Sequence, residues 1–514
     1  MRVVVLAFVL GVASLARADL LTRVLADADG AGGGGSGSSS PAADDLIAWA
    51  GEPRAIELPE LLQIAVRQAP PLQGARFDIA VAEAQIGQTW ARGDWHVQAQ
   101  ATGSKTLGAF AGLAVSSDQY GGTADIYRLL PTGGTIDLHV GTSYTKQSLP
   151  MFGTSTIWQD TLSGSITQPL LKGAGRFIYD ANEQKARLSR DVAVLARRLA
   201  AINTVQTVVS AYWDLVLAER QVAITEQSLQ LARERLRVTQ IGAQGGKIAQ
   251  AEIPAVEQII ATREEDVLNG ELGVLNASIA LRRAAGMPIG AGDLGLRVAT
   301  DLDVPDRSVA LPQAVERAYQ ASPELAELEK QRQSATIDIE VTENGLLPQL
   351  DAALSLGPTA QGNNFTSALR DTVEFKQLAV NGSLTFSRSL EQRDVRYRES
   401  ELRAAREKLT VNAFDVRAQY AQGVSRAVAA LELAKRRIVL SRRAIELAKE
   451  NIRIETDRFN LGTRTNFDVL NRLEDLRQAE LREAQALIDW HKAETSVQAL
   501  TGDLLPTYGI DVDH

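Results

Sequence analysis

Two long stretches of the chain carry hydrophobic residues at every seventh position. In the second half, one series consists of Leu431, Ile438, Ile445, Ile452 and Phe459, and another consists of Leu433, Leu440, Leu447 and Ile454. The first half has the same two series, in Val208, Leu215, Val222, Leu229 and Leu236 and in Leu217, Ile224, Leu231 and Val238. A repeat of seven is typical of a helix that coils with a neighbour. The pattern predicts two very long helices, over about 176–241 and 389–459.

The two series on each long helix lie on nearly opposite sides. They are offset by two residues, which is about 200° around an α-helix. A helix in a dimeric coiled coil needs one apolar seam, whereas a helix in the wall of a cylinder needs two, one for each neighbour. A fully buried bundle helix could also be apolar on two sides. Because Arg436, Arg437, Arg442 and Arg443 lie between the seams, the sequence favours the cylinder wall.

The chain repeats one order of elements in two halves. One register has an offset of 253 and relates Leu58 to Leu311 and Pro70 to Pro323. A second register has an offset of 216 and relates Leu231 to Leu447 and Gly246 to Gly462. The change of offset indicates an insertion of a few tens of residues in the first half. The predicted repeats span 58–286 and 311–502, with a linker at 287–310 and a C-terminal tail at 503–514.

Each half follows the same plan. A helix of about 33–35 residues comes first (58–92 and 311–343), and alternating segments, the long helix, a glycine turn and a third helix (about 250–285 and 466–500) follow. At about 1.5 Å per residue, the first and third helices together equal the long helix, roughly 100 Å. Two short helices stacked end to end would therefore match one long helix.

Between the first helix and the long helix, the hydrophobic period changes from seven to two. Apolar and polar residues alternate at 95–101, 136–140, 162–167, 350–356 and 380–386. Such strands suit a transmembrane β-barrel, although a soluble half-buried sheet alternates in the same way. Each half offers about two strands. Because four strands cannot close a pore and an open edge in lipid leaves backbone groups unpaired, several chains must share one barrel.

The first half of the chain complicates the strand count. Residues 120–147 read as a further hairpin around Pro131 to Gly134. This hairpin could lengthen an existing strand, form an external loop or add strands.

The N-terminus has the features of a signal peptide. Arg2 precedes an apolar run at 3–15, and cleavage is predicted after Ala18. Loss of residues 1–18 removes two Arg and no acids, so the net charge changes from −9 to −11. This acidic balance argues against nucleic acid as a partner. The Gly/Ser-rich run AGGGGSGSSSP predicts a flexible segment at 19–57.

The sequence offers no catalytic or cofactor chemistry. It contains no cysteine, which excludes disulfides, thiolate metal sites and Cys nucleophiles. None of the four His stands in a metal-ligand spacing. We therefore expect neither an enzyme nor a bound cofactor or metal.

The doubled order of elements resembles the TolC-like outer-membrane efflux proteins over about residues 56–503. The segment GTRTNFDVL, from Gly462 to Leu470, is similar to the second helix tip of that family, and ITQPLL, from Ile166 to Leu171, to the segment that leads from barrel to long helix. The resemblance implies an α+β membrane protein and a homotrimer. A twelve-stranded β-barrel, shared by the chains and facing lipid in the outer membrane of a Gram-negative-type bacterium, would continue as an α-helical barrel through the periplasm.

The resemblance also implies partners at the lower end of the tunnel. A periplasmic adaptor and an inner-membrane transporter would dock there, at helix tips formed by Gly246, Leu461 and Gly462. Glycine suits a tip because it ends a helix where the chain must reverse.

The same tips would form a gate. In the family, an acid of the first tip is tied to an Arg and a Tyr of the second, and Glu252, Arg464 and Phe459 stand at these positions. Phe lacks the hydroxyl that Tyr would use. Of the family's two rings of Asp at the narrowest point, Asp468 matches the first and Asn471 replaces the second. Arg464 and Asp468 are also four residues apart and could simply pair on a helix surface.

These features predict a passive exit duct for a tripartite efflux pump or a type I secretion system. The alternative is a periplasmic coiled-coil adaptor or structural protein. An adaptor should carry one helical hairpin and soluble β modules, whereas this sequence predicts two hairpins and strands with an apolar face.

Overall fold

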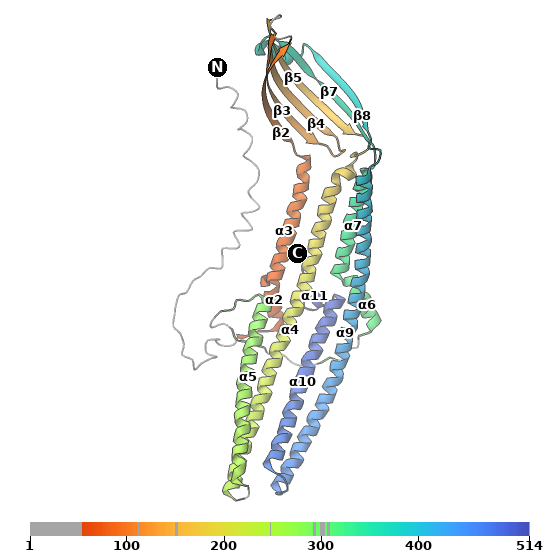
Figure 1. The fold of residues 1–514 in the computed structure, drawn as a ribbon. Coiled ribbons are helices and arrows are strands. Elements are labelled where there is room, and N and C mark those ends of the chain that lie inside the picture. The colour runs from red at the N-terminus through yellow and green to blue at the C-terminus, as the bar shows by residue number, and fades with distance from the viewer. Residues whose placement is uncertain are drawn as a thin grey trace, which may run out of the picture.

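The computed structural model describes residues 54–110, 113–149, 153–246, 248–290, 294–298, 304–305 and 309–512. These residues form a long body in which helices lie side by side and a β-sheet occupies one end (Figure 1). The predicted signal peptide at 1–18 and the Gly/Ser-rich run of the N-terminal segment lie outside the described residues.

Two helices run through most of the helical part. The helix α4 (Arg176–Gln244) has 69 residues and α9 (Arg393–Asn460) has 68, which is roughly 100 Å each. Beside α4 lie α3 (Pro70–Trp90) and α5 (Ile253–Ala285), and beside α9 lie α7 (Pro323–Asn344) and α10 (Asn466–Thr501) (Figure 1). The two long helices and the end-to-end arrangement of the shorter ones are confirmed.

The first helix of each half is broken in two, which corrects the single helices predicted at 58–92 and 311–343. The helix α2 (Leu58–Gln68) ends at Ala69, and α6 (Leu311–Ala321) ends at Ser322, where the backbone is extended with ψ of 124° and 114°. Both joints stand directly before a proline. Since proline disfavours helical geometry in the residue before it, each helix ends there.

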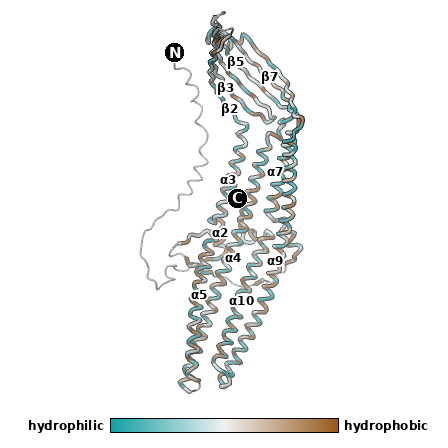
Figure 2. The backbone as a smooth tube through the Cα atoms, in the orientation of Figure 1, coloured by the Kyte–Doolittle hydropathy of each residue, from teal (hydrophilic) through white to brown (hydrophobic). Residues whose placement is uncertain are grey.

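The seams of the two long helices differ in burial. The helix α4 contacts α3 and α5 as well as α7 and α10, whereas α9 contacts α6, α7 and α10. On α9, Leu431 of the first series is 2% exposed, but Leu433 and Leu440 of the second series are 58% and 69% exposed. Figure 2 shows hydrophobic and hydrophilic residues interleaved along the helices. The second seam of α9 therefore faces away from the rest of the described chain.

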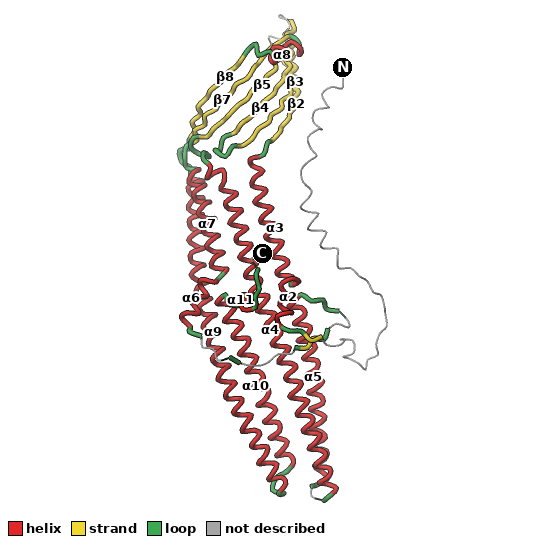
Figure 3. Tube along the Cα trace, turned by 180° about the vertical axis from the view of Figure 1, so that it is seen from behind, coloured by secondary structure: helices red, strands yellow, loops and turns green. Residues whose placement is uncertain are grey.

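Six strands form one antiparallel sheet in the order β2-β3-β4-β5-β7-β8 (Figure 3). Their bounds are β2 His96–Phe110, β3 Leu113–Leu129, β4 Thr135–Leu149, β5 Gly153–Pro169, β7 Gln349–Gly362 and β8 Leu378–Ser387. The prediction of about four strands per chain is wrong, because the segment at 120–147 adds β3 and β4. The two added strands span 113–149, and these 37 residues equal the difference between the repeat offsets of 253 and 216.

One face of the sheet is apolar and the other is polar. A row across all six strands reads Val97, Ile126, Leu138, Gly164, Leu356 and Val380. The adjacent row, on the opposite face, reads His96, Tyr127, Asp137, Ser165, Ser355 and Asn381. The large apolar side chains of the first row are exposed. An exposed apolar surface of this extent marks contact with a membrane or a partner. A short helix, α8 (Phe365–Val373), packs on β5 and β7 at the rim (Figure 3).

The main hydrophobic core lies around the middle of α4. It includes Leu61, Tyr212, Leu215, Leu281 and Leu504. Among the described residues, α4 is the one helix long and apolar enough to cross a membrane by length and composition. The predicted linker contributes β6 (Leu296–Arg297), which pairs with β1 (Arg54–Ala55), and the predicted tail contributes α11 (Leu504–Thr507). Both segments are thus held against the core.

Candidate functional site

The two helical hairpins of the chain end in tips far from the sheet (Figure 1). Gly246 and Gly462 stand at the tips in left-handed conformation, with φ of 71° and 74°. At the second tip, Thr463 N donates to Arg458 O and Gly462 N donates to Phe459 O, which closes the last turn of α9. Glycine adopts this conformation without the cost that a Cβ would add. The predicted glycine turns are confirmed, and Leu461 between α9 and Gly462 is 79% exposed.

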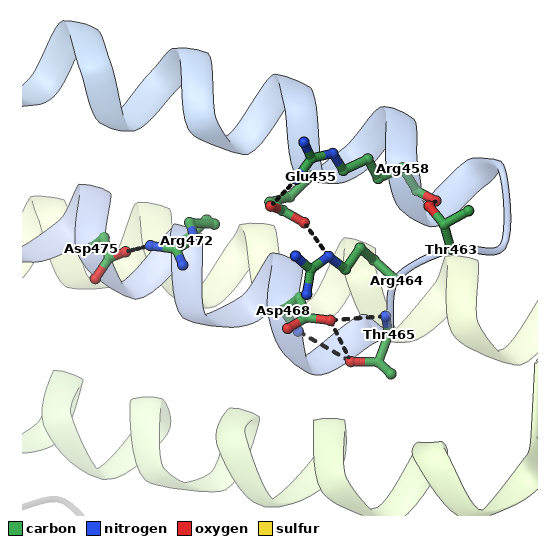
Figure 4. Close-up of polar contacts among 8 residues, drawn as sticks. All are labelled: Glu455, Arg458, Thr463, Arg464, Thr465, Asp468, Arg472 and Asp475. Carbon is green, nitrogen blue, oxygen red and sulfur yellow. Dashed lines mark hydrogen bonds and ion pairs between the residues drawn. The ribbon is translucent and has the colours of Figure 1, made fainter.

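Asp468 is part of a reciprocal cap at the start of α10. Its backbone N–H donates to Thr465 Oγ1, and its Oδ2 accepts from Thr465 N at 3.0 Å and from Thr465 Oγ1 at 2.9 Å (Figure 4). The hydrogen bonds from Thr465, together with Arg464 and Arg472 nearby, lower the pKa of Asp468 from 3.8. This arrangement satisfies free N–H groups at the helix start. Asn471 lies one turn further along the same helix and is exposed.

Arg464 pairs within its own tip. Its Nε lies 3.5 Å from Glu455 Oε2, while Arg458 Nη1 lies 3.2 Å from Glu455 Oε1 (Figure 4). Among the described residues, the predicted ion pair between Glu252 and Arg464 is not formed within one chain, and a pair between chains stays a prediction. For the predicted surface pairing of Arg464 with Asp468, Arg464 helps to lower the pKa of the Asp468 carboxyl, but no hydrogen bond joins the two side chains among the described residues.

Glu252 and Phe459 both interact with the side chain of Arg235 on α4. The guanidinium carbon of Arg235 lies 4.0 Å from the centre of the Phe459 ring. Burial lowers the pKa of Arg235, and the Glu252 carboxylate opposes that effect. Glu252 Oε2 is buried with no hydrogen-bond partner among the described residues. A buried carboxylate oxygen of this kind is costly unless a donor is supplied from elsewhere.

A buried polar tie connects the two hairpins. Asn466 is 2% exposed, and its Nδ2 donates to Thr239 Oγ1 at 2.7 Å. Its Oδ1 accepts from Arg235 Nε. Thr239 Oγ1 in turn donates to the carbonyl of Arg235 at 2.8 Å. The tie therefore joins α4 of the first hairpin to the first residue of α10 in the second.

Sequence reasoning missed Arg235, Thr239 and Asn466. A signal was present, since Thr225, Ala232 and Thr239 are spaced by seven and all are buried on α4. A buried polar residue has hydrogen-bond partners, and Asn466 is the partner of Thr239 from the other hairpin.

On the side of the tie that faces away from the tips, apolar and charged layers continue the contact between the hairpins. Leu229, Ala232, Val256, Ile260 and Leu470 form one hydrophobic cluster. Arg263 of α5, 5% exposed, lies 3.6 Å from Glu474 of α10, which also pairs with Arg477 at 2.7 Å. Burial lowers the pKa of Arg263 and Glu474 opposes it. The hairpins are thus held together by packing as well as by polar contacts.

The tips present no arrangement for metal chemistry. Within the part of the chain that the structure describes, no group of three or more His, Cys, Asp and Glu could hold a metal ion. His491 stacks on Trp213 with ring centres 3.9 Å apart, and burial lowers its pKa to about 4. This histidine is a neutral packing residue at ordinary pH.

Comparison with known proteins relates this architecture to channels. The solved structure of the outer-membrane channel OprN is similar, with a TM-score of 0.64, 15% identity and coverage of 87% of this chain and 90% of that chain. The CmeC outer membrane channel of Campylobacter jejuni is similar with a TM-score of 0.61, 12% identity and coverage of 87% and 86%. At these identities the likeness concerns the fold.

Sequence comparison gives the family. Nodulation protein T of Rhizobium leguminosarum bv. trifolii is 21% identical over 349 residues, which is 66% of this chain and 70% of that protein. The model of the family described as outer membrane efflux protein matches residues 131–287 and 314–503, more than half of the chain. The chain therefore belongs to the outer membrane efflux protein family, which places it in the outer membrane.

Proposed function

We propose that three copies of this chain form a channel-tunnel, a passive exit duct for a tripartite efflux pump or a type I secretion system. The observation that carries the proposal is that the chain is an open layer with two complementary edges. One edge is formed by α3, α5 and β2, and the other by α9 and β8 (Figure 1).

Both helical edges carry exposed apolar side chains. On one edge these are Phe77 and Val81 of α3 and Leu268 and Leu272 of α5. On the other edge they are Val411, Phe414, Leu433, Leu440 and Leu447 of α9. Burial of such residues stabilises association at about 25 cal/mol per Å² of apolar surface. The second seam of α9 would thus meet α3 and α5 of the next chain, which closes a cylinder.

The sheet would close in the same way. Its apolar face suits lipid and its polar face suits a water-filled interior. Unpaired backbone groups at the β2 and β8 edges are costly in a membrane unless another chain pairs with them.

The tips would gate the periplasmic entrance. Asp468 would supply one ring of three carboxylates, since Asn471 cannot supply a second. Glu252, for whose buried Oε2 the described residues supply no donor, would accept from Arg464 of the next chain. Phe459, held under Arg235, would replace the hydroxyl-based tie with packing against a cation.

Docking of a periplasmic adaptor and its inner-membrane transporter would use the same tips. Leu461 and Phe467 are exposed apolar residues there, 79% and 61%, and Gly246 and Gly462 hold the turns that present the tip surfaces. The alternative, an adaptor or structural coiled coil, does not account for the exposed apolar face of the sheet.

Fractionation and conductance test the proposal. We expect the protein in outer-membrane fractions as a heat-resistant trimer that forms ion-conducting channels in planar bilayers. A water-soluble single chain with no channel activity would overturn it.

A further inference from the structure

The sheet contains two more strands than the repeated plan of the chain requires. The second half contributes β7 and β8, and the corresponding strands of the first half are β2 and β5, which follow α3 and precede α4. The hairpin of β3 and β4 lies between them at 113–149, and its 37 residues equal the difference between the two repeat offsets. The hairpin is therefore an insertion into a plan of four strands per chain.

The inserted hairpin is built into the wall of the sheet. β3 pairs with β2 from His96↔Tyr127 to Phe110↔Leu113, and β4 pairs with β5 from Thr135↔Thr167 to Leu149↔Gly153. The two strands also keep the alternation of faces. Ile126 and Leu138 lie in the apolar row, whereas Asp125 and His139 lie on the polar face with Oδ1 and Nδ1 2.5 Å apart. The hairpin therefore widens the sheet and is not an external loop.

The insertion leaves the edges of the sheet compatible with a ring. β2 runs away from α3 and β8 runs toward α9, so β8 of one chain and β2 of the next are antiparallel. This holds for any even number of strands per chain, and the hairpin adds two. The edges also coincide with the edges of the helical layer, because β2 continues α3 and β8 leads into α9 (Figure 1).

We propose that three chains close a barrel of eighteen strands, six from each, in place of the twelve that the family resemblance implies, and that the β3–β4 hairpin sets the width of the outer opening. The inference rests on the proposed trimeric duct, and the occupant of each sheet edge is a second copy of this chain. Eighteen strands about 4.8 Å apart and tilted by about 40° give a barrel about 36 Å across between backbone centres, against about 24 Å for twelve. The extracellular end would therefore admit bulkier solutes than a twelve-stranded exit, while the tips still limit entry from the periplasm.

Deletion of residues 113–149 tests the width. The deletion would join β2 to β5, which remain antiparallel, and would restore one offset of 216 throughout the chain. Channels of both proteins in planar bilayers are probed with polyethylene glycols of graded size, added to the extracellular side. We expect the largest polymer radius admitted by the intact protein to exceed that admitted by the deletion variant by about half. Equal cut-offs would overturn the proposed width, whereas absence of channels from both proteins would overturn the proposed function.

Cross-linking of the intact chain gives a second test that does not depend on the deletion variant. Because the sequence has no cysteine, Gln98→Cys on β2 can be combined with Ala379→Cys, Asn381→Cys or Ser383→Cys on β8, and oxidised in outer membranes. All these positions lie on the polar face. We expect at least one pair to give a ladder that ends at three chains.

The cross-linking result has two outcomes that would contradict the proposal. A ladder that ends at two chains would indicate a twelve-stranded barrel from a dimer, and no cross-link from any pair would show that the edges do not meet. The matched control combines Gln98→Cys with Ser163→Cys. These residues lie in one row but three strands apart, so this pair is expected to give no cross-link.

Discussion

In the proposed duct, replacement of Asn466 by alanine should open the periplasmic end. The Asn466 side chain is the central member of the tie between the hairpins, since it donates to Thr239 Oγ1 and accepts from Arg235 Nε. Both partners belong to α4, whereas Asn466 belongs to α10. The alanine variant keeps the helix but removes the connection.

The expected loss of free energy in the closed state follows from the two hydrogen bonds that the variant lacks. One is a buried hydrogen bond between neutral groups and one involves a charged donor, which together contribute about 2–4 kcal/mol. If the hairpins separate on opening, the closed state of each chain loses this amount relative to the open state. A change of about 2–4 kcal/mol corresponds to roughly 30- to 800-fold in the equilibrium between the two states.

Single-channel recording in planar bilayers measures the effect. We expect the Asn466→Ala channel to show a larger conductance or a longer open time than the wild type. Asn451→Ala is the matched control, because Asn451 is an exposed asparagine of α9, and it should leave the channel unchanged. In a double-mutant cycle, Thr239→Val should add little to Asn466→Ala. Wild-type conductance and open time in an intact Asn466→Ala trimer would refute the idea that this tie holds the tip closed.

Three further predictions concern the same tips. Charge reversal in Glu252→Arg or Arg464→Glu should raise the open-channel conductance, and no change in either variant would exclude a latch between chains. Asp468→Ala should weaken block of the channel by polyvalent cations, and equal block of both proteins would remove Asp468 from the aperture. Because the pKa of Asp468 is lowered from 3.8, its charge and its cap are fully present above about pH 4 and are lost only as the pH falls through the lowered value. Block of the wild-type channel should therefore persist down to about pH 4. Phe459→Tyr adds the hydroxyl that the family resemblance implies at this position and should lower the conductance. A higher conductance would show that packing of Phe459 against Arg235 is the stronger contact.

The sequence predicted those features of the fold that depend on residues close together in the chain. The seven-residue series predicted the long helices, and the glycines at 246 and 462 predicted the tips. Pro70 and Pro323 align the two repeats, and each also predicts the end of a helix at the residue before it. Their effect on Ala69 and Ser322 is local, so the breaks between α2 and α3 and between α6 and α7 could have been predicted.

The remaining features depend on contacts between distant segments. The polar tie joins Thr239 to Asn466, which are 227 residues apart, and no spacing within either helix reveals the pairing. The number of strands depends on whether the hairpin at 113–149 pairs with β2 and β5 or projects from the sheet. Alternation of polar and apolar residues is the same in both cases. The two offsets held the missing information, because their difference is the length of the hairpin.

The burial of the seams supports the proposed closure of the layer into a ring. The sequence gives α4 and α9 the same two series, yet α4 has neighbours on both sides and α9 has packed neighbours on one side. A contact between unlike edges of identical chains produces either an open filament or a closed ring. A filament would leave one β2 edge and one β8 edge unpaired in lipid, which is costly, whereas a ring leaves none. In the proposed ring, the apolar seams would therefore supply the attraction between chains, and the sheet edges in the membrane would select the closed arrangement.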